Sequence, residues 1–193
     1  YFGLRELGKR HFYWLDLWAL AEQCVSPDET LAGVTYFSAR VTSPPEKAAR
    51  QFTYLNALSA HRPQMKHIYG HYRSEPEECF GCHRVRQVNE EKMTDVNIAC
   101  SMIEDAIDDR YDKALLVSGD SDLTPPVKLI RRRWPDKVIV IACPPKRKSF
   151  HLCRHASGSF NLSERKLRHS LLPPTVTTAS GTELHCPPEW RRQ

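Results

Sequence analysis

Apolar positions follow two different spacings along the chain, and each spacing is typical of one kind of element. Continuous apolar runs such as 113–119 and 137–143 are typical of buried strands. Apolar residues that recur every three to four positions, as they do over 94–109, predict a helix with one buried face. The predicted helices cover 12–24, 43–61, 94–109, 124–134, 149–156 and 163–172, and the predicted strands cover 33–41, 66–72, 113–119, 137–143 and 158–162.

This alternation of strands and helices predicts an α/β fold with a mostly parallel central sheet and helices on both of its faces. The length of 193 residues suits one domain, which we place at residues 1–172. Residues 73–91 are polar and turn-prone, so we expect a cysteine-containing loop there. Residues 173–193 are rich in Pro and Thr and have little to bury, so we expect a flexible C-terminal tail.

The net charge and the cysteine content indicate which kind of binding partner and which cellular compartment suit the protein. The formal net charge of +5 favours a polyanionic partner. The seven cysteines are scattered rather than spaced as a disulfide framework, which suits the reducing cytoplasm. No run reaches the roughly 18 apolar residues of a membrane span, so we expect no membrane partner. These features leave open whether the chain forms a homodimer.

Two carboxylates stand directly after the predicted strand at 113–119. Asp120 and Asp122 therefore belong at the carboxyl end of a strand, where ligands of α/β folds gather. Converging carboxylates attract a hard cation such as Mg²⁺, which can activate water and neutralise charge on a phosphodiester. The alternative is a helix cap at Asp122 or Thr124, with Asp120 as a turn residue. Asp95, in the first turn of a predicted helix, is a third candidate, although the helix dipole alone also favours an acid there.

Two ordered motifs, "TDVNIA" at 94–99 and "VSGDSDL" at 117–123, resemble signatures of the NYN domain of the LabA-like group, a branch of the PIN-like nucleases. The resemblance extends over nearly all of the chain except the tail. It implies a Rossmann-like PIN fold. It also implies a ribonuclease that hydrolyses RNA with the help of Mg²⁺ or Mn²⁺.

The resemblance assigns roles to particular residues. Asp95, Asp120 and Asp122 fall on the acids that hold the metal, and Ser118 falls on a small residue that orients water or phosphate. One departure concerns the start of the chain. Family members usually open with a strand that ends in an Asp-Gly-x-Asn motif, whereas this chain begins at "YFGLRE". We therefore expect the first strand and its acid to be missing and the chain to be a poor nuclease, because Asp16 lies inside a predicted helix and does not replace that acid.

Cys79 and Cys82 form a single CxxC pair, followed directly by His83. A structural zinc ion takes four nitrogen or sulfur ligands, and a second CxxC pair nearby is missing. Zinc binding at Cys79 and Cys82 and a reduced, metal-free loop are therefore both open.

Basic residues follow the predicted strand at 137–143. Lys146, Arg147 and Lys148 come at the same predicted sheet edge as the acids and could contact RNA phosphates, a role that does not specify sequence. A solvated loop is the alternative. The run at 131–133 ends a helix, where cations suit the helix dipole, and we prefer that interpretation for these arginines.

The interpretation that combines these features is a metal-dependent endoribonuclease. A non-catalytic RNA-binding or regulatory module that retains the acids is the first alternative. A second alternative takes "DSD" as the metal-binding motif of a nucleotide-sugar transferase, and the preceding "TDVNIA" argues against it.

Overall fold

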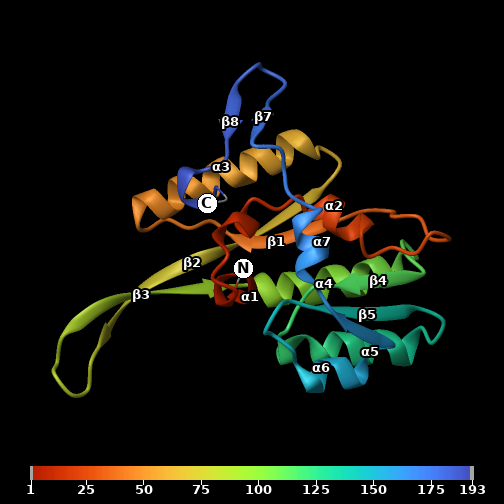
Figure 1. Ribbon diagram of the computed structural model, residues 1–193. Coiled ribbons are helices and arrows are strands. Elements are labelled where there is room, and N and C mark those ends of the chain that lie inside the picture. The colour runs from red at the N-terminus through yellow and green to blue at the C-terminus, as the bar shows by residue number, and fades with distance from the viewer. Residues whose placement is uncertain (1, 192–193) are drawn as a thin grey trace.

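The computed structural model describes residues 2–191, apart from the side chains of residues 2–3, 73–75 and 86–90. It has the predicted α/β character, but the described strands form two three-stranded sheets and a small hairpin instead of one central sheet (Figure 1). The helices are α1 (Phe2–Glu6), α2 (Leu17–Glu22), α3 (Pro45–His61), α4 (Thr94–Ile107), α5 (Thr124–Arg133), α6 (Phe150–His155) and α7 (Glu164–Arg168), with 3-10 helices η1 (Arg10–Tyr13), η2 (Ser121–Leu123) and η3 (Pro188–Trp190). The strands are β1 (Thr35–Ala39), β2 (Lys66–Glu78), β3 (Val85–Lys92), β4 (Lys113–Leu116), β5 (Val138–Cys143), β6 (Gly158–Asn161), β7 (Thr175–Thr177) and β8 (Glu183–His185).

The parallel sheet β4-β5-β6 has helices on both faces, as predicted. Successive side chains of its central strand β5 point to opposite faces, as the geometry of a strand requires. Ile139 and Ile141 pack on one face with residues of α4, α5 and α6. Ala142 packs on the other face with Leu20 of α2 and Leu167 of α7. Because both faces are buried, the strand reads in the sequence as a continuous apolar run.

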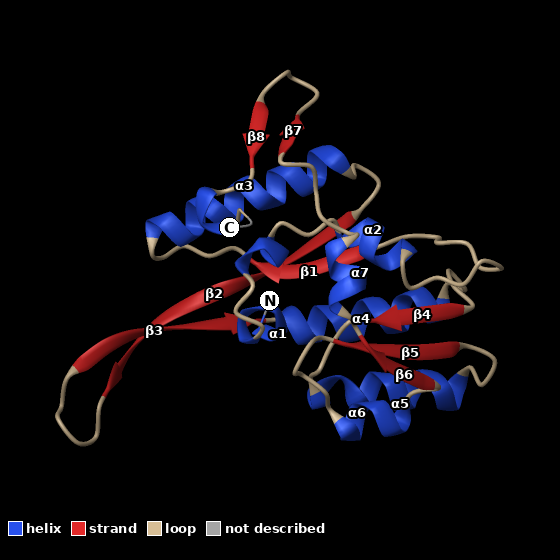
Figure 2. Ribbon diagram, viewed as in Figure 1, coloured by secondary structure: helices blue, strands red, loops and turns tan. Residues whose placement is uncertain are grey.

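The second sheet has the order β1-β2-β3 and corrects the prediction of a loop at 73–91. β1 pairs in parallel with the first part of β2, and the rest of β2 pairs antiparallel with β3. Most of the expected loop is therefore a long hairpin, which extends away from the helices (Figure 2). Residues 76–85 of the hairpin are exposed, so their sequence does not need the alternation of a half-buried strand.

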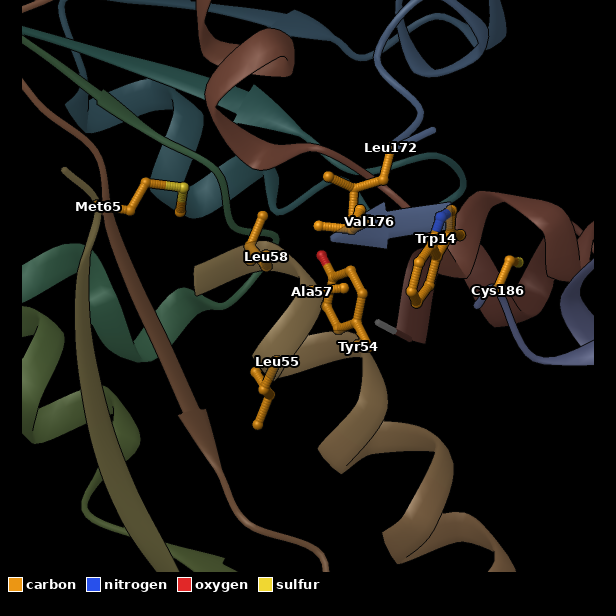
Figure 3. Packing of buried hydrophobic residues seen from close by; sticks show 9 residues of the cluster. All are labelled: Trp14, Tyr54, Leu55, Ala57, Leu58, Met65, Leu172, Val176 and Cys186. Atoms are coloured by element: carbon orange, nitrogen blue, oxygen red, sulfur yellow. The ribbon is translucent and has the colours of Figure 1, made fainter. Parts of the chain in front are cut away.

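Residues 173–191 form β7, β8 and η3 in place of the expected flexible tail. Val176 and Cys186 are buried in a cluster that also contains Trp14, Tyr54 of α3 and Leu58 of α3 (Figure 3). Few apolar residues are present in this segment, but two of them lie where they close the outer side of α3. Apolar content alone therefore underestimated how well this segment packs.

Asp16 is the N-cap of α2 and does not lie inside a helix as expected. Its side chain accepts hydrogen bonds from the backbone N–H groups of Trp18 and Ala19 at 3.0 and 3.1 Å. The long helix predicted over 12–24 is divided here into η1 and α2. The division allows Leu15 to form a β-bridge with Leu171 of the C-terminal part of the chain.

The first strand expected from the family resemblance stays a prediction. Among the described residues, β1 pairs with β2 alone and β4 pairs with β5 alone, so each of these strands has one edge without a partner strand there. Within residues 2–191, none of the helices combines the length and the apolar character that crossing a membrane requires.

Candidate functional site

The turn after β4 is held by its own polar side chains. Ser118 Oγ accepts a hydrogen bond from the backbone N–H of Asp120 at 3.1 Å. Asp120 Oδ1 accepts one from the backbone N–H of Asp122 at 3.0 Å and caps η2. The role expected for Ser118 stays a prediction, and the contact that the structure shows is the one to the backbone of this turn.

The expected helix cap at Asp122 or Thr124 is not present. Leu123 is the N-cap of α5, and no side chain makes a capping hydrogen bond there. Thr124 Oγ1 donates instead to the carbonyl oxygen of Ser121 at 2.6 Å. Asp120 is a turn residue, as the alternative interpretation expected, but capping does not explain Asp122.

Asp95 lies in the first turn of α4, and the charges around its carboxyl group affect its pKa. Partial desolvation raises the pKa of Asp95, and the negative charges of Asp120, Asp122 and Glu91 raise it further. The structure therefore brings the three predicted acids within electrostatic reach of one another. It adds Glu91, from the end of β3, whose Oε1 accepts a hydrogen bond from Thr94 Oγ1 at 2.6 Å.

The charges of these acids influence one another, but their side chains are not arranged as the ligands of one metal ion in the described residues. In the described part of the chain, no three His, Cys, Asp or Glu side chains are arranged to hold a metal ion. One oxygen of Asp120 is already bonded to the backbone of the turn. The donor atoms are all carboxylate oxygens, which suit Mg²⁺ or Mn²⁺ in preference to softer metals.

Gly119 brings the basic loop of residues 146–148 against the acidic turn. A Cβ atom on Gly119 would lie 2.6 Å from the carbonyl oxygen of Arg147, which is closer than real Cβ contacts come. Only glycine lets the two loops approach in this way. The turn that carries Asp120 and the basic loop therefore lie side by side.

The basic loop itself contacts the end of α1. Lys146 Nζ donates to the carbonyl oxygen of Glu6 at 3.1 Å, and Arg147 Nε pairs with Glu6 Oε1 at 2.7 Å. Lys148 Nζ lies 5.3 Å from the centre of the Phe150 ring. The three basic side chains are exposed, and an exposed ion pair is worth only about 0–1 kcal/mol. The side chains are therefore accessible from solvent, and their contact with RNA phosphates stays a prediction.

A groove of about 440 Å³ opens beside Asp122, and its basic residues were missed by sequence reasoning. Lys128 and Arg132 are four positions apart on α5 and therefore lie on the same side of the helix. His151 of α6 also lines the groove, and its Nδ1 lies 3.1 Å from Thr124 Oγ1. The groove is lined by Ser121, Asp122, Thr124, Pro125, Lys128, Leu129, Arg132 and His151.

The run of arginines at the end of α5 therefore has several roles. Arg132 lines the groove, whereas Arg131 donates to the carbonyl oxygen of His155 at 2.9 Å and ties α5 to the end of α6. A favourable interaction with the helix dipole is expected for all three arginines, so it does not explain why their contacts differ. The spacing of Lys128 and Arg132 was the available signal.

Cys79 and Cys82 lie in the turn between β2 and β3, and both are exposed. The backbone N–H groups of Gly81 and Cys82 lower the pKa of the Cys79 thiol, and the Cys82 thiol adds to this effect. The expected neighbour His83 is engaged elsewhere, since its Nδ1 lies 2.7 Å from Glu78 Oε1.

Comparisons with known proteins agree with this architecture. A protein of unknown function from Vibrio parahaemolyticus RIMD 2210633 has a crystal structure that is similar to this chain, with a TM-score of 0.50, 20% identity and coverage of 82% of each chain. At this identity the likeness concerns the fold alone. None of the curated proteins matches the chain. The model of the NYN domain matches residues 18–163, which is well over half of the sequence, and the chain therefore belongs to the NYN domain family.

Proposed function

We propose that this chain is a divalent-metal-dependent endoribonuclease of the LabA-like group, with Asp95, Asp120 and Asp122 as the metal-binding acids. NYN domains are generally of the nuclease type and act on RNA. The observation that carries the proposal is the convergence of Asp95 with Asp120 and Asp122: burial raises the pKa of Asp95, and the charges of Asp120 and Asp122 raise it further. Carboxylates with perturbed pKa values cluster at functional sites, and carboxylates that converge attract a hard cation.

The acidic residues of the chain have different roles at the proposed site. A bound Mg²⁺ or Mn²⁺ would activate water and offset the charge that develops on the phosphodiester. Asp120 is held in place by its bond to the Asp122 backbone, so the turn presents its second oxygen in a restricted range of positions. Glu91 adds a fourth carboxylate near Asp95, where it could accept a proton from the attacking water.

The basic groove gives the RNA strand a path away from the acids. Asp122 belongs both to the acidic cluster and to the groove, so a phosphate in the groove would lie next to the one at the acids. Lys128, Arg132 and His151 offer donors for that phosphate, and Lys146 to Lys148 offer donors on the other loop. Contacts of this kind position a strand without selecting its sequence.

A non-catalytic RNA-binding module is the second candidate, and one observation favours it. No three ligands in the described residues are arranged to hold a metal ion. The two candidates differ in what Mn²⁺ does. A nuclease binds Mn²⁺ at the acids and cleaves single-stranded RNA, whereas a binding module retains the RNA intact at every Mn²⁺ concentration.

The variant Asp95→Asn should bind Mn²⁺ about tenfold or more weakly, yet be more stable than the wild type without metal. The native state holds the Asp95 proton more tightly than the unfolded chain does, because the pKa of Asp95 is raised. Ionising this carboxyl group therefore costs stability at neutral pH, and that cost disappears as the pH falls below about 3.9. Calorimetric titration with Mn²⁺ and thermal melting between pH 3 and 8 measure the two effects.

The control for this variant is Asp136→Asn, which removes an exposed acid from the turn before β5. It should leave Mn²⁺ affinity and the melting profile unchanged. Equal Mn²⁺ affinity in the wild type and in Asp95→Asn would remove Asp95 from the metal site. A stability gain that persists at pH 3 would show that the gain does not arise from ionisation.

Replacing Lys128 or Arg132 with Ala should weaken binding of single-stranded RNA to a similar extent for every sequence. Each lost phosphate contact should also make the salt dependence shallower, by up to about 0.7 in the slope of log K against log salt. Arg133→Ala is the matched control, because Arg133 is exposed on the same helix and lies outside the set of residues that line the groove. Fluorescence anisotropy at several salt concentrations measures both quantities. Identical slopes for Arg132→Ala and Arg133→Ala would mean that the groove is not on the path of the RNA.

A further inference from the structure

The tip of the β2–β3 hairpin is a preformed cysteine turn. The backbone N–H of Cys79 donates to the carbonyl oxygen of Arg84 at 3.0 Å, and the N–H of His83 donates to the carbonyl oxygen of Cys79 at 2.8 Å. The thiols of Cys79 and Cys82 are both exposed, on either side of the exposed Phe80 in this turn. Both thiols are therefore presented to solvent by one short turn that the backbone fixes.

This turn offers half of a structural zinc site. Zinc in such sites takes four ligands in a tetrahedron, with Zn–S distances of about 2.3 Å. The two thiols supply two of them. Among the described residues no third His, Cys, Asp or Glu completes a group with them, and the imidazole of His83 faces Glu78. A monomer therefore leaves two coordination positions without a protein ligand from the described residues.

A second copy of the chain can supply the missing ligands. The hairpin carries its tip away from the helices and from the other strands, so another hairpin can approach it end to end (Figure 1). We propose that two copies of this chain share one Zn²⁺ ion, bound by Cys79 and Cys82 of each copy. Each copy would present the same pair of ligands to the other, which is the arrangement that a twofold axis produces.

The surroundings of the two cysteines fit this arrangement. Phe80, between them, is fully exposed at 102% of its reference area, which is unusual for a large apolar side chain. Close approach of two tips would bring the two Phe80 rings toward each other and remove apolar surface from water. Four thiolates and one Zn²⁺ leave an excess of two negative charges, and Arg84 of each copy, two residues after Cys82, supplies positive charge nearby.

The experiment measures metal content and mass on the same sample. Chain purified without chelator should contain one zinc ion for every two chains and should elute at twice the 22.3 kDa mass in light scattering. Removal of zinc by a chelator should return the monomer, and addition of zinc should restore the dimer. Titration of the metal-free chain with Co²⁺ should reach its endpoint at one ion for every two chains.

Cys79→Ser and Cys82→Ser should each lose the zinc and the dimer while keeping the melting temperature of the monomer. Cys100→Ser is the matched control, because Cys100 is also exposed but lies on α4, away from the hairpin tip. One zinc ion per monomer would overturn the proposal, and so would a dimer that persists without metal or a chain that stays monomeric in excess zinc. None of these outcomes depends on RNA cleavage, so the proposal does not rest on the nuclease function.

Discussion

Asp120→Asn should lower metal-dependent cleavage of single-stranded RNA about 100-fold or more. A metal ion in a hydrolytic site contributes several kcal/mol of charge stabilisation, and each 1.36 kcal/mol corresponds to about a tenfold change in rate. Asn retains an oxygen that can accept the hydrogen bond from the Asp122 backbone, so the turn can keep its shape. The change therefore removes charge from the site with little disturbance of the fold.

The measurement is the single-turnover rate with saturating enzyme, at fixed Mn²⁺ and salt. Asp136→Asn again serves as the control, and thermal melting of both variants checks that each is folded. A rate within threefold of the wild type in Asp120→Asn would exclude Asp120 from the metal site. A wild-type chain that binds Mn²⁺ and RNA but leaves the RNA intact would favour the non-catalytic module.

The acids could be predicted from sequence because their position depends on local rules. Asp120 and Asp122 follow a continuous apolar strand, and the end of such a strand is a defined place in an α/β sheet. Glu91 could not be found in this way. It lies at the end of β3, a strand that sequence reasoning did not predict, and it lies near Asp95 only because β3 leads directly into α4.

The basic groove could not be predicted because it depends on the packing of two helices. Lys128 and Arg132 look like ordinary surface residues of α5 until α6 places His151 beside them. The same limit applies to the segment at 173–191, where Val176 is buried by contact with residues far away in the sequence. Local spacing describes one element, whereas a groove or a packed terminal segment belongs to at least two.

The last large effect is expected at a buried ion pair far along the chain from the acids. Asp16 is 2% exposed, and its Oδ2 accepts a hydrogen bond from Arg62 Nε at 2.8 Å and forms an ion pair with Arg62 Nη2 at 2.8 Å. Its backbone N–H donates to the carbonyl oxygen of Ser170 at 2.8 Å. The Asp16 side chain thus joins the start of α2 to the end of α3. The Asp16 backbone joins both to the C-terminal segment.

Arg62→Met should lower the free energy of unfolding by about 2–3 kcal/mol, because it leaves the Asp16 carboxylate buried without its main partner. Loss of one partner of a fully buried pair costs about 3–5 kcal/mol. The cost here is smaller because the helix N–H groups still bond Asp16 and His61 Nε2 lies 3.6 Å from Oδ2. For a chain of this size, the change corresponds to a fall of roughly 4–12 °C in melting temperature.

Arg50→Met is the matched control, since its ion pair with Glu189 is solvent-exposed and should contribute less than about 1 kcal/mol. Urea unfolding of both variants measures the difference, and equal losses would show that the Asp16–Arg62 pair is no stronger than a surface ion pair.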